Sequence, residues 1–150
     1  MNHKQANKVK HLAALVNKVL EGFSWNWQPK WGDYFINKFD DSICIFLTDR
    51  DEFMDYFLPN GNTQLMHKAD FKYYALPILP WEEIERVLEK AGYEILVATK
   101  KCGNNERCVS IEKLSCDNKG LLHLPVTCLC YAKSRIEAVY KAVIELGKEK

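Results

Sequence analysis

The chain has 150 residues, of which 47% are hydrophobic and 27% are charged, with 21 Lys and Arg against 20 Asp and Glu. This size and composition are typical of one ordered globular domain with its own core, and they exclude a disordered or collagen-like protein. Residues 1–80 carry nine basic and nine acidic side chains, and residues 81–150 carry twelve and eleven. Neither half therefore attracts phosphate strongly, and strong nucleic-acid binding is not expected.

The amino terminus lacks the apolar core and small-residue cleavage site of a signal peptide, and no run of about 18 consecutive apolar residues occurs. We therefore expect a cytoplasmic protein that does not enter a membrane. Six cysteines would suit three disulfides in a secreted domain, but in a reducing cytosol they are expected to be free thiols. They are Cys44, Cys102, Cys108, Cys116, Cys128 and Cys130.

The first predicted element is a helix over residues 9–23. Its apolar residues recur at steps of three and four, which places them on one helical face. Gly22 is expected to end the helix. The stripe consists of Val9, Leu12, Val16, Val19 and Phe23, widened by Leu15 and Leu20.

The next stretch, residues 23–35, is predicted to be a loop because Pro29 and Gly32 interrupt it. Of the 18 aromatic residues in the chain, 14 lie between Phe23 and Tyr74. Such density indicates either a second core, in which rings cover the back of a sheet, or a face that binds a partner or stacks on bases. The candidate binding residues are Trp25, Trp27, Trp31 and Tyr34.

The continuous apolar run at residues 42–47 predicts a buried strand that contains Cys44. After it, Thr48 precedes Asp51 by three residues and Asp49 precedes Glu52 by three, the spacing at which side chains cap a short helix. A calcium loop is the alternative for these acids, but no Gly follows where such a loop needs one.

Residues 59–62 (PNGN) predict a turn, and residues 71–80 are expected to be extended. His67 and Asp70 could form a base and its orienting partner, but no nucleophile stands at a recognisable spacing. We interpret His67 as an isolated surface histidine.

Residues 81–147 predict helix, three strands and helix. Pro80, Glu82 and Glu83 favour a helix start, and Gly92 a helix end. YEILVATK, RCVSIEKLS and LHLPVTCLCYA read as strands joined by short polar turns, hence as an antiparallel meander, with Pro125 marking an edge or a bulge. A capping box from Ser134 to Glu137 begins the last helix, and Gly147 is expected to end it.

We predict an α+β fold with an αβββα core at residues 81–147 and an antiparallel sheet of three to four strands. The helix at 9–23 and the aromatic stretch are expected to cover the bare face of that sheet, giving an α/β/α sandwich. The whole chain, 1–150, is predicted to be a single domain, with residues 1–80 supporting the scaffold at 81–147.

The sequence motifs that could indicate a metal site or an active site are weak. Five cysteines from Cys102 to Cys130, with His123, could supply zinc ligands, but their spacing does not match a structural zinc knuckle, and small buried thiols are the alternative interpretation. A glycine-rich phosphate loop, a serine elbow and paired histidines at helical spacing are all absent from the sequence. We therefore predict no catalytic residues, no metal and no cofactor, while an enzyme with scattered carboxylates stays an open alternative.

Two families resemble parts of the chain. The αβββα order and the stretch AKSRIEAVYKAVIEL resemble double-stranded RNA-binding domains. The basic cluster of that family is reduced here to Lys133 and Arg135, and its Gly-Pro-x-His turn is missing, which removes most of the expected phosphate affinity.

The phrases HLAALVNKVLEGFSW and YAKSRIEAVYKAVIELG are similar to the opening and closing segments of the phage α/β/α (ABA) sandwich domain family. The resemblance implies a phage or prophage accessory protein without established catalytic residues, and it leaves the middle of the aromatic stretch, from about residue 33 to 74, without a counterpart. We expect a binding protein whose partner is a host protein. Sequestration of a nucleotide or another small ligand, or binding of double-stranded RNA, is the alternative.

Overall fold

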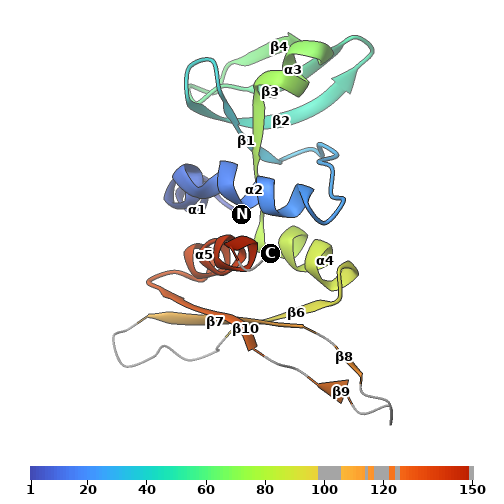
Figure 1. Cartoon of the computed structure of the whole chain (residues 1–150). Helices are drawn as coiled ribbons and strands as arrows, with labels where there is room; N and C mark the ends of the chain where they lie inside the picture. Colours follow the sequence, from blue (N-terminus) through green and yellow to red (C-terminus); the bar gives the residue numbers. More distant parts are fainter. Residues whose placement is uncertain (98–105, 114, 117–121, 124–125, 149–150) are drawn as a thin grey trace. The chain divides into compact units, whose positions relative to one another are not determined.

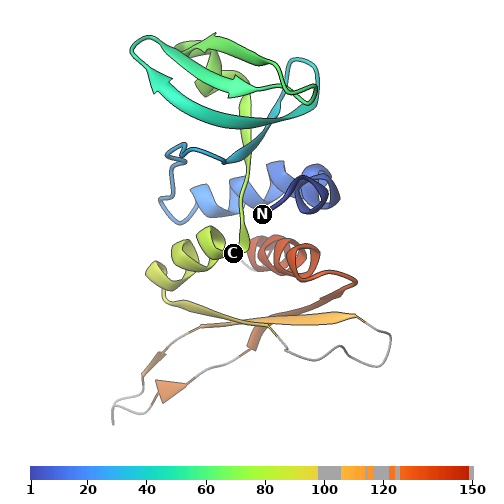
Figure 2. The ribbon, with the colours of Figure 1, turned by 180° about the vertical axis from the view of Figure 1, so that it is seen from behind.

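A computed structural model of the chain describes residues 1–97, 106–113, 115–116, 122–123 and 126–148. The chain divides into two compact units, a first unit of residues 1–13 and 26–79 and a second unit of residues 14–25 and 80–150. Figure 1 labels their elements, and Figure 2 shows the same ribbon from behind. Helices combined with antiparallel sheets confirm the α+β class, while the single domain stays a prediction.

The first unit begins with α1 (His3–Val9), whose start is capped by Asn2 and Gln5, followed by the 3-10 turn η1 (Lys10–Leu12). The rest is a five-stranded antiparallel sheet in the order β4-β3-β2-β1-β5, with α3 (Lys68–Tyr74) joining the edge strands β4 and β5. The strands are β1 (Tyr34–Asn37), β2 (Ser42–Arg50), β3 (Phe53–Phe57), β4 (Thr63–His67) and β5 (Ala75–Ile78).

An aromatic core lies between this sheet and α3. Phe71 of α3 packs against Phe35 of β1 with ring centroids 5.1 Å apart and against Phe46 of β2 at 5.8 Å. Aromatic density in this stretch is therefore explained in part by a second core, one of the two alternatives that the sequence left open. The buried cluster consists of Phe35, Cys44, Phe46, Met54, Tyr56 and Phe71, with Trp27, Leu58, Met66 and Ala75 packed against it.

The predicted strand at 42–47 and the turn at 59–62 are confirmed, but the capped helix near Thr48 is wrong. β2 continues to Arg50, and the chain reverses at Asp51, whose φ of 46° lies in the left-handed region. Pairing of Arg50 with Phe53 then starts a β2–β3 hairpin. The predicted extended stretch after His67 is wrong in its first part, because α3 precedes β5.

The second unit contains the predicted αβββα order. α4 (Trp81–Lys90) is followed by the antiparallel meander β6 (Tyr93–Val97), β7 (Arg107–Lys113) and β10 (Val126–Ala132), and α5 (Arg135–Lys148) follows β10. β10 is an edge strand with a register shift between Val126 and Cys128, as expected next to Pro125, which itself lies outside the described residues. A small pair, β8 (Ser115–Cys116) and β9 (Leu122–His123), forms a separate ladder.

Both helices of this motif lie on one face of the meander (Figures 1 and 2). The N-cap half of the capping box predicted for α5 is confirmed, since the Glu137 N–H donates to Ser134 Oγ at 3.4 Å. The Ser134 hydroxyl in turn donates to the Glu137 carboxylate at 2.9 Å. Gly92 ends α4 with a φ of 89°, as predicted. Both helices bury apolar side chains that recur at steps of three and four residues: Ile84, Val87, Leu88, Ile136, Val139, Tyr140 and Val143.

The helix at 9–23 was expected to cover the bare face of the meander, but the helix α2 (Ala13–Glu21) does not lie on that face. It lies on the side of α4 and α5 that faces away from the meander (Figure 1), and Val19 of α2 approaches Gly147 of α5 closely. Because α5 continues to Lys148, Gly147 lies inside the helix, and the prediction that Gly147 ends it is wrong. The predicted helix at 9–23 starts earlier than expected, at His3, and is interrupted by η1. Leu15, which the sequence placed beside its apolar stripe, is 52% exposed.

Candidate functional site

Trp31 lies at the tip of a hydrogen-bonded turn in the first unit and is 79% exposed. The Asp33 N–H donates to the Lys30 carbonyl at 3.0 Å, which closes the turn, and Gly32 at its third position has a φ of 87°. This is the pattern of a type II turn, in which a positive φ at the third position favours glycine. Trp31 therefore projects from the second position, where its side chain meets solvent.

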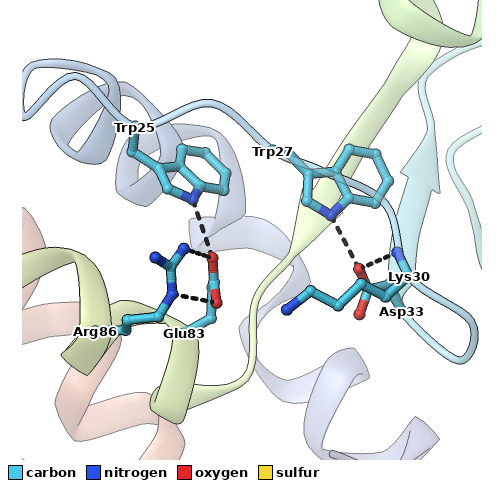
Figure 3. Close-up of polar contacts among 6 residues, drawn as sticks. All are labelled: Trp25, Trp27, Lys30, Asp33, Glu83 and Arg86. Atoms are coloured by element: carbon cyan, nitrogen blue, oxygen red, sulfur yellow. Dashed lines mark hydrogen bonds and ion pairs between the residues drawn. The ribbon is translucent and has the colours of Figure 1, made fainter.

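Two further sets of hydrogen bonds hold the turn in place, and Figure 3 shows the first of them. The Asp33 carboxylate accepts from the Lys30 N–H at 2.9 Å and from the Trp27 indole at 3.1 Å. The Gly32 N–H donates to the Phe46 carbonyl, and the Phe46 N–H donates to the Asp33 carbonyl, both at 2.8 Å. The backbone on either side of Trp31 is thus tied to β2 and to the core.

Trp27 is a structural residue. Its ring stacks on Phe71 at 5.7 Å with an interplanar angle of 26° and lies 6.1 Å from the Phe35 ring. Since its indole nitrogen is also bonded to Asp33, its polar and apolar parts are both used inside the first unit. The prediction that Trp27 is a binding residue is not supported by this geometry.

Trp25 belongs to the second unit and is half-buried. Its indole N–H donates to the Glu83 carboxylate at 3.3 Å, and Arg86 holds the same carboxylate (Figure 3). Tyr34, the first residue of β1, is half-buried with its ring 6.3 Å from that of His3. Of the four predicted binding residues, only Trp31 presents most of its ring to solvent.

A second group of exposed rings was missed by sequence reasoning. Phe39, on the turn between β1 and β2, is 81% exposed, and Tyr73, near the end of α3, is 72% exposed. Tyr74 lies between them in edge-on contact with both rings, at 6.0 Å and 4.9 Å, and the Lys38 ammonium lies 5.9 Å from the Tyr73 ring centroid. The sequence signal was an apolar Phe inside the polar stretch NKFDDS.

The turn that presents Phe39 is well bonded. The Phe39 N–H donates to the Asn37 side chain at 3.0 Å, and the Asp40 carboxylate accepts from the hydroxyl and the N–H of Ser42 at 2.6 Å and 3.0 Å. These bonds lower the pKa of Asp40, the Ser42 hydroxyl contributing most. Lys10 pairs with the next residue, Asp41, at 3.1 Å.

The His67 side chain has a structural role at the start of α3. His67 uses its Nδ1 to accept the Ala69 N–H at 3.2 Å, so this nitrogen caps the helix and is not held by Asp70 as the base and its orienting partner would require. Among the side chains that the structure describes, no three His, Cys, Asp or Glu residues are grouped to hold a metal ion. The zinc candidates Cys102, Cys116, His123 and Cys128 have side chains outside that description.

No family model, curated protein or solved structure matches the chain. The resemblances to the phage sandwich domain and to double-stranded RNA-binding domains therefore stay predictions. In the described part of the chain, none of the helices is long and apolar enough to cross a membrane.

Proposed function

We propose that this chain is a small non-enzymatic accessory protein of phage or prophage type that acts in the cytoplasm by binding a host protein, with Trp31 as the anchor of the contact. The observation that carries the proposal is a tryptophan that is 79% exposed on a turn fixed by hydrogen bonds. Tryptophan is one of the three residue types, with tyrosine and arginine, that are enriched among the side chains that dominate binding energy at protein interfaces.

The rigid turn adds to this argument. Association costs free energy for every side chain and loop that must be ordered, and a turn already held by Asp33 and by β2 has little of that cost left to meet. A large ring presented in this way is expected to enter a pocket of the partner. Balanced charge in both halves of the chain also favours a protein partner over nucleic acid.

Capture of host proteins on immobilised chain tests the proposal, with Trp31→Ala compared with Phe39→Ala. The two wild-type residues are 79% and 81% exposed, so each variant removes one aromatic ring that is mostly in solvent. We expect wild type and Phe39→Ala to retain the same host protein and Trp31→Ala to lose it. Equal capture by wild type and Trp31→Ala would refute the proposal.

Small ligands are distinguished by a thermal-shift panel of nucleotides. The proposal predicts an unchanged melting temperature with each nucleotide, because the exposed Trp31 ring is offered to a partner and encloses nothing by itself. A raised melting temperature with a nucleotide, abolished by Trp31→Ala, would instead identify the ligand-sequestration alternative.

A further inference from the structure

The strand β4 is an edge of the five-stranded sheet, paired on one side with β3. Its five residues, TQLMH, contain no Lys, Arg, Asp, Glu or Pro. Natural edge strands usually carry such residues because they discourage pairing with another chain. The opposite edge strand, β5, does contain one, Pro77, so the two edges of this sheet differ in protection.

The β3–β4 register and the hydrogen bonds at its two ends show which backbone groups of β4 point outward. At one end of the β3–β4 hairpin the Leu58 N–H donates to the Asn62 carbonyl, and at the other the Lys68 N–H donates to the Glu52 carbonyl. In an antiparallel ladder, hydrogen-bonded pairs alternate with non-bonded pairs. Bonded pairs therefore fall on even-numbered residues, and Thr63, Leu65 and His67 turn their N–H groups away from β3.

Apolar side chains accompany this outward edge. Leu65 is 51% exposed and pairs with Asp55, which places Leu65 on the same sheet face as Phe53, 42% exposed. The helix α3 does not cover this face, since its buried residue Phe71 packs on Phe35 and Phe46, which belong to the opposite face of the sheet. Asp55 adds no free charge here because Arg50 pairs with it at 3.4 Å.

We propose that β4 pairs with β4 of a second copy of this chain, antiparallel about a two-fold axis at Leu65, joining two sheets into one. In this register Leu65 faces Leu65, Thr63 faces His67, and Gln64 faces Met66. The two Leu65 residues exchange two backbone hydrogen bonds, and each His67 N–H donates to the partner's Thr63 carbonyl. The His67 carbonyl, at the cap position of α3, is used by the helix.

The pairing of two β4 strands brings no like charges together, and its small contact area indicates a weak dimer. Lys68 would face Asn62, so like charges do not meet, and Lys68 is already paired with Asp49 at 2.7 Å. A contact of five paired residues from each copy, with two apolar side chains each, belongs with the weak interfaces that bury less than about 1,200 Å² in total. The dimer is therefore expected to depend on concentration and not to be obligate.

Sedimentation of the full chain over a concentration series tests this pairing. We expect the average mass to rise from 17.5 kDa towards twice that value. Leu65→Lys should weaken association by at least about tenfold, because two ammonium groups would meet at the axis. Leu15→Lys is the matched control, since Leu15 is 52% exposed on α2, and it should associate as wild type does.

A second variant isolates the backbone. Leu65→Pro removes an N–H that β3 does not use, so the fold should tolerate it at this edge while association is lost. Trp31→Ala should leave the dimer intact, which separates this inference from the proposed host contact. A mass of 17.5 kDa at every concentration, or unchanged association of folded Leu65→Lys, would overturn the pairing.

Discussion

Trp27 and Trp31 are four residues apart in the chain but have different roles in the structure. The Trp27 ring is stacked in the core of the first unit, whereas the Trp31 ring meets solvent. We expect Trp27→Ala to lower the free energy of unfolding by about 2–4 kcal/mol, somewhat below the full cost of a buried tryptophan because Trp27 is half-buried.

Trp31→Ala is the matched change at an exposed site and should alter the free energy of unfolding by no more than about 0.5 kcal/mol. Urea denaturation followed by circular dichroism measures both values. A loss of similar size for the two variants would show that Trp31 is also a packing residue.

Asp40 gives the Phe39 turn a pH dependence. Its folded-state pKa is lowered by the Ser42 hydroxyl and N–H, below the ordinary value that the unfolded chain retains. The stabilisation is therefore complete above the unfolded pKa, near pH 4, and is lost as the pH falls through the lower folded pKa. Ser42→Ala should raise the Asp40 pKa in an NMR titration of its carboxyl carbon. An unchanged pKa would show that this hydroxyl is not the main cause.

The helices α2 and α5 approach each other closely where Gly147 faces Val19. In an exposed helix, Gly→Ala would stabilise by about 1 kcal/mol. Here the added Cβ would overlap the Val19 side chain, which is stiff because it is β-branched. Overpacking costs about 1–3 kcal/mol, so Gly147→Ala is expected to destabilise the second unit.

The compensating double variant decides the cause. Val19→Ala combined with Gly147→Ala should recover most of the stability lost by Gly147→Ala alone, measured by thermal unfolding. If Gly147→Ala by itself raises the melting temperature, the close approach of α2 to α5 is wrong.

The elements that sequence reasoning predicted correctly are those with local signals. Residues close together in the chain specify the helix α4 with its end at Gly92, the Ser134 cap of α5 and the three strands of the meander. The β3 strand was missed because Thr48 and Asp51 have the spacing of a helix cap, while the hairpin depends on pairing of Arg50 with Phe53 and on a left-handed Asp51.

The candidate site was predicted only in part for the same reason. Four aromatic residues at 25–34 look alike in sequence, and only tertiary contacts separate Trp27, which stacks on Phe71, from Trp31, which does not reach the core. The Phe39 cluster forms from rings on β1–β2 and α3 that are more than thirty residues apart. No periodicity along the chain could have indicated that contact.

For the whole molecule, charge and geometry argue against strong binding of double-stranded RNA. Arg135, one of two basic residues at the start of α5, has its guanidinium carbon 5.0 Å from the centre of the Trp81 ring. With a net charge of +1, we expect duplex RNA to bind no more tightly than about 10⁻⁴ M at physiological salt. Filter binding over a salt series measures this. Micromolar affinity with a steep salt dependence would contradict it.

The exposed Trp31 ring is the proposed anchor of the protein contact. The most direct test of this role is calorimetric titration of the captured host protein with wild type and with Trp31→Ala, both shown to be folded. We predict a loss of at least about 2 kcal/mol in binding free energy, which is roughly 30-fold in affinity. An affinity of Trp31→Ala equal to that of wild type would show that the exposed tryptophan is not the binding residue.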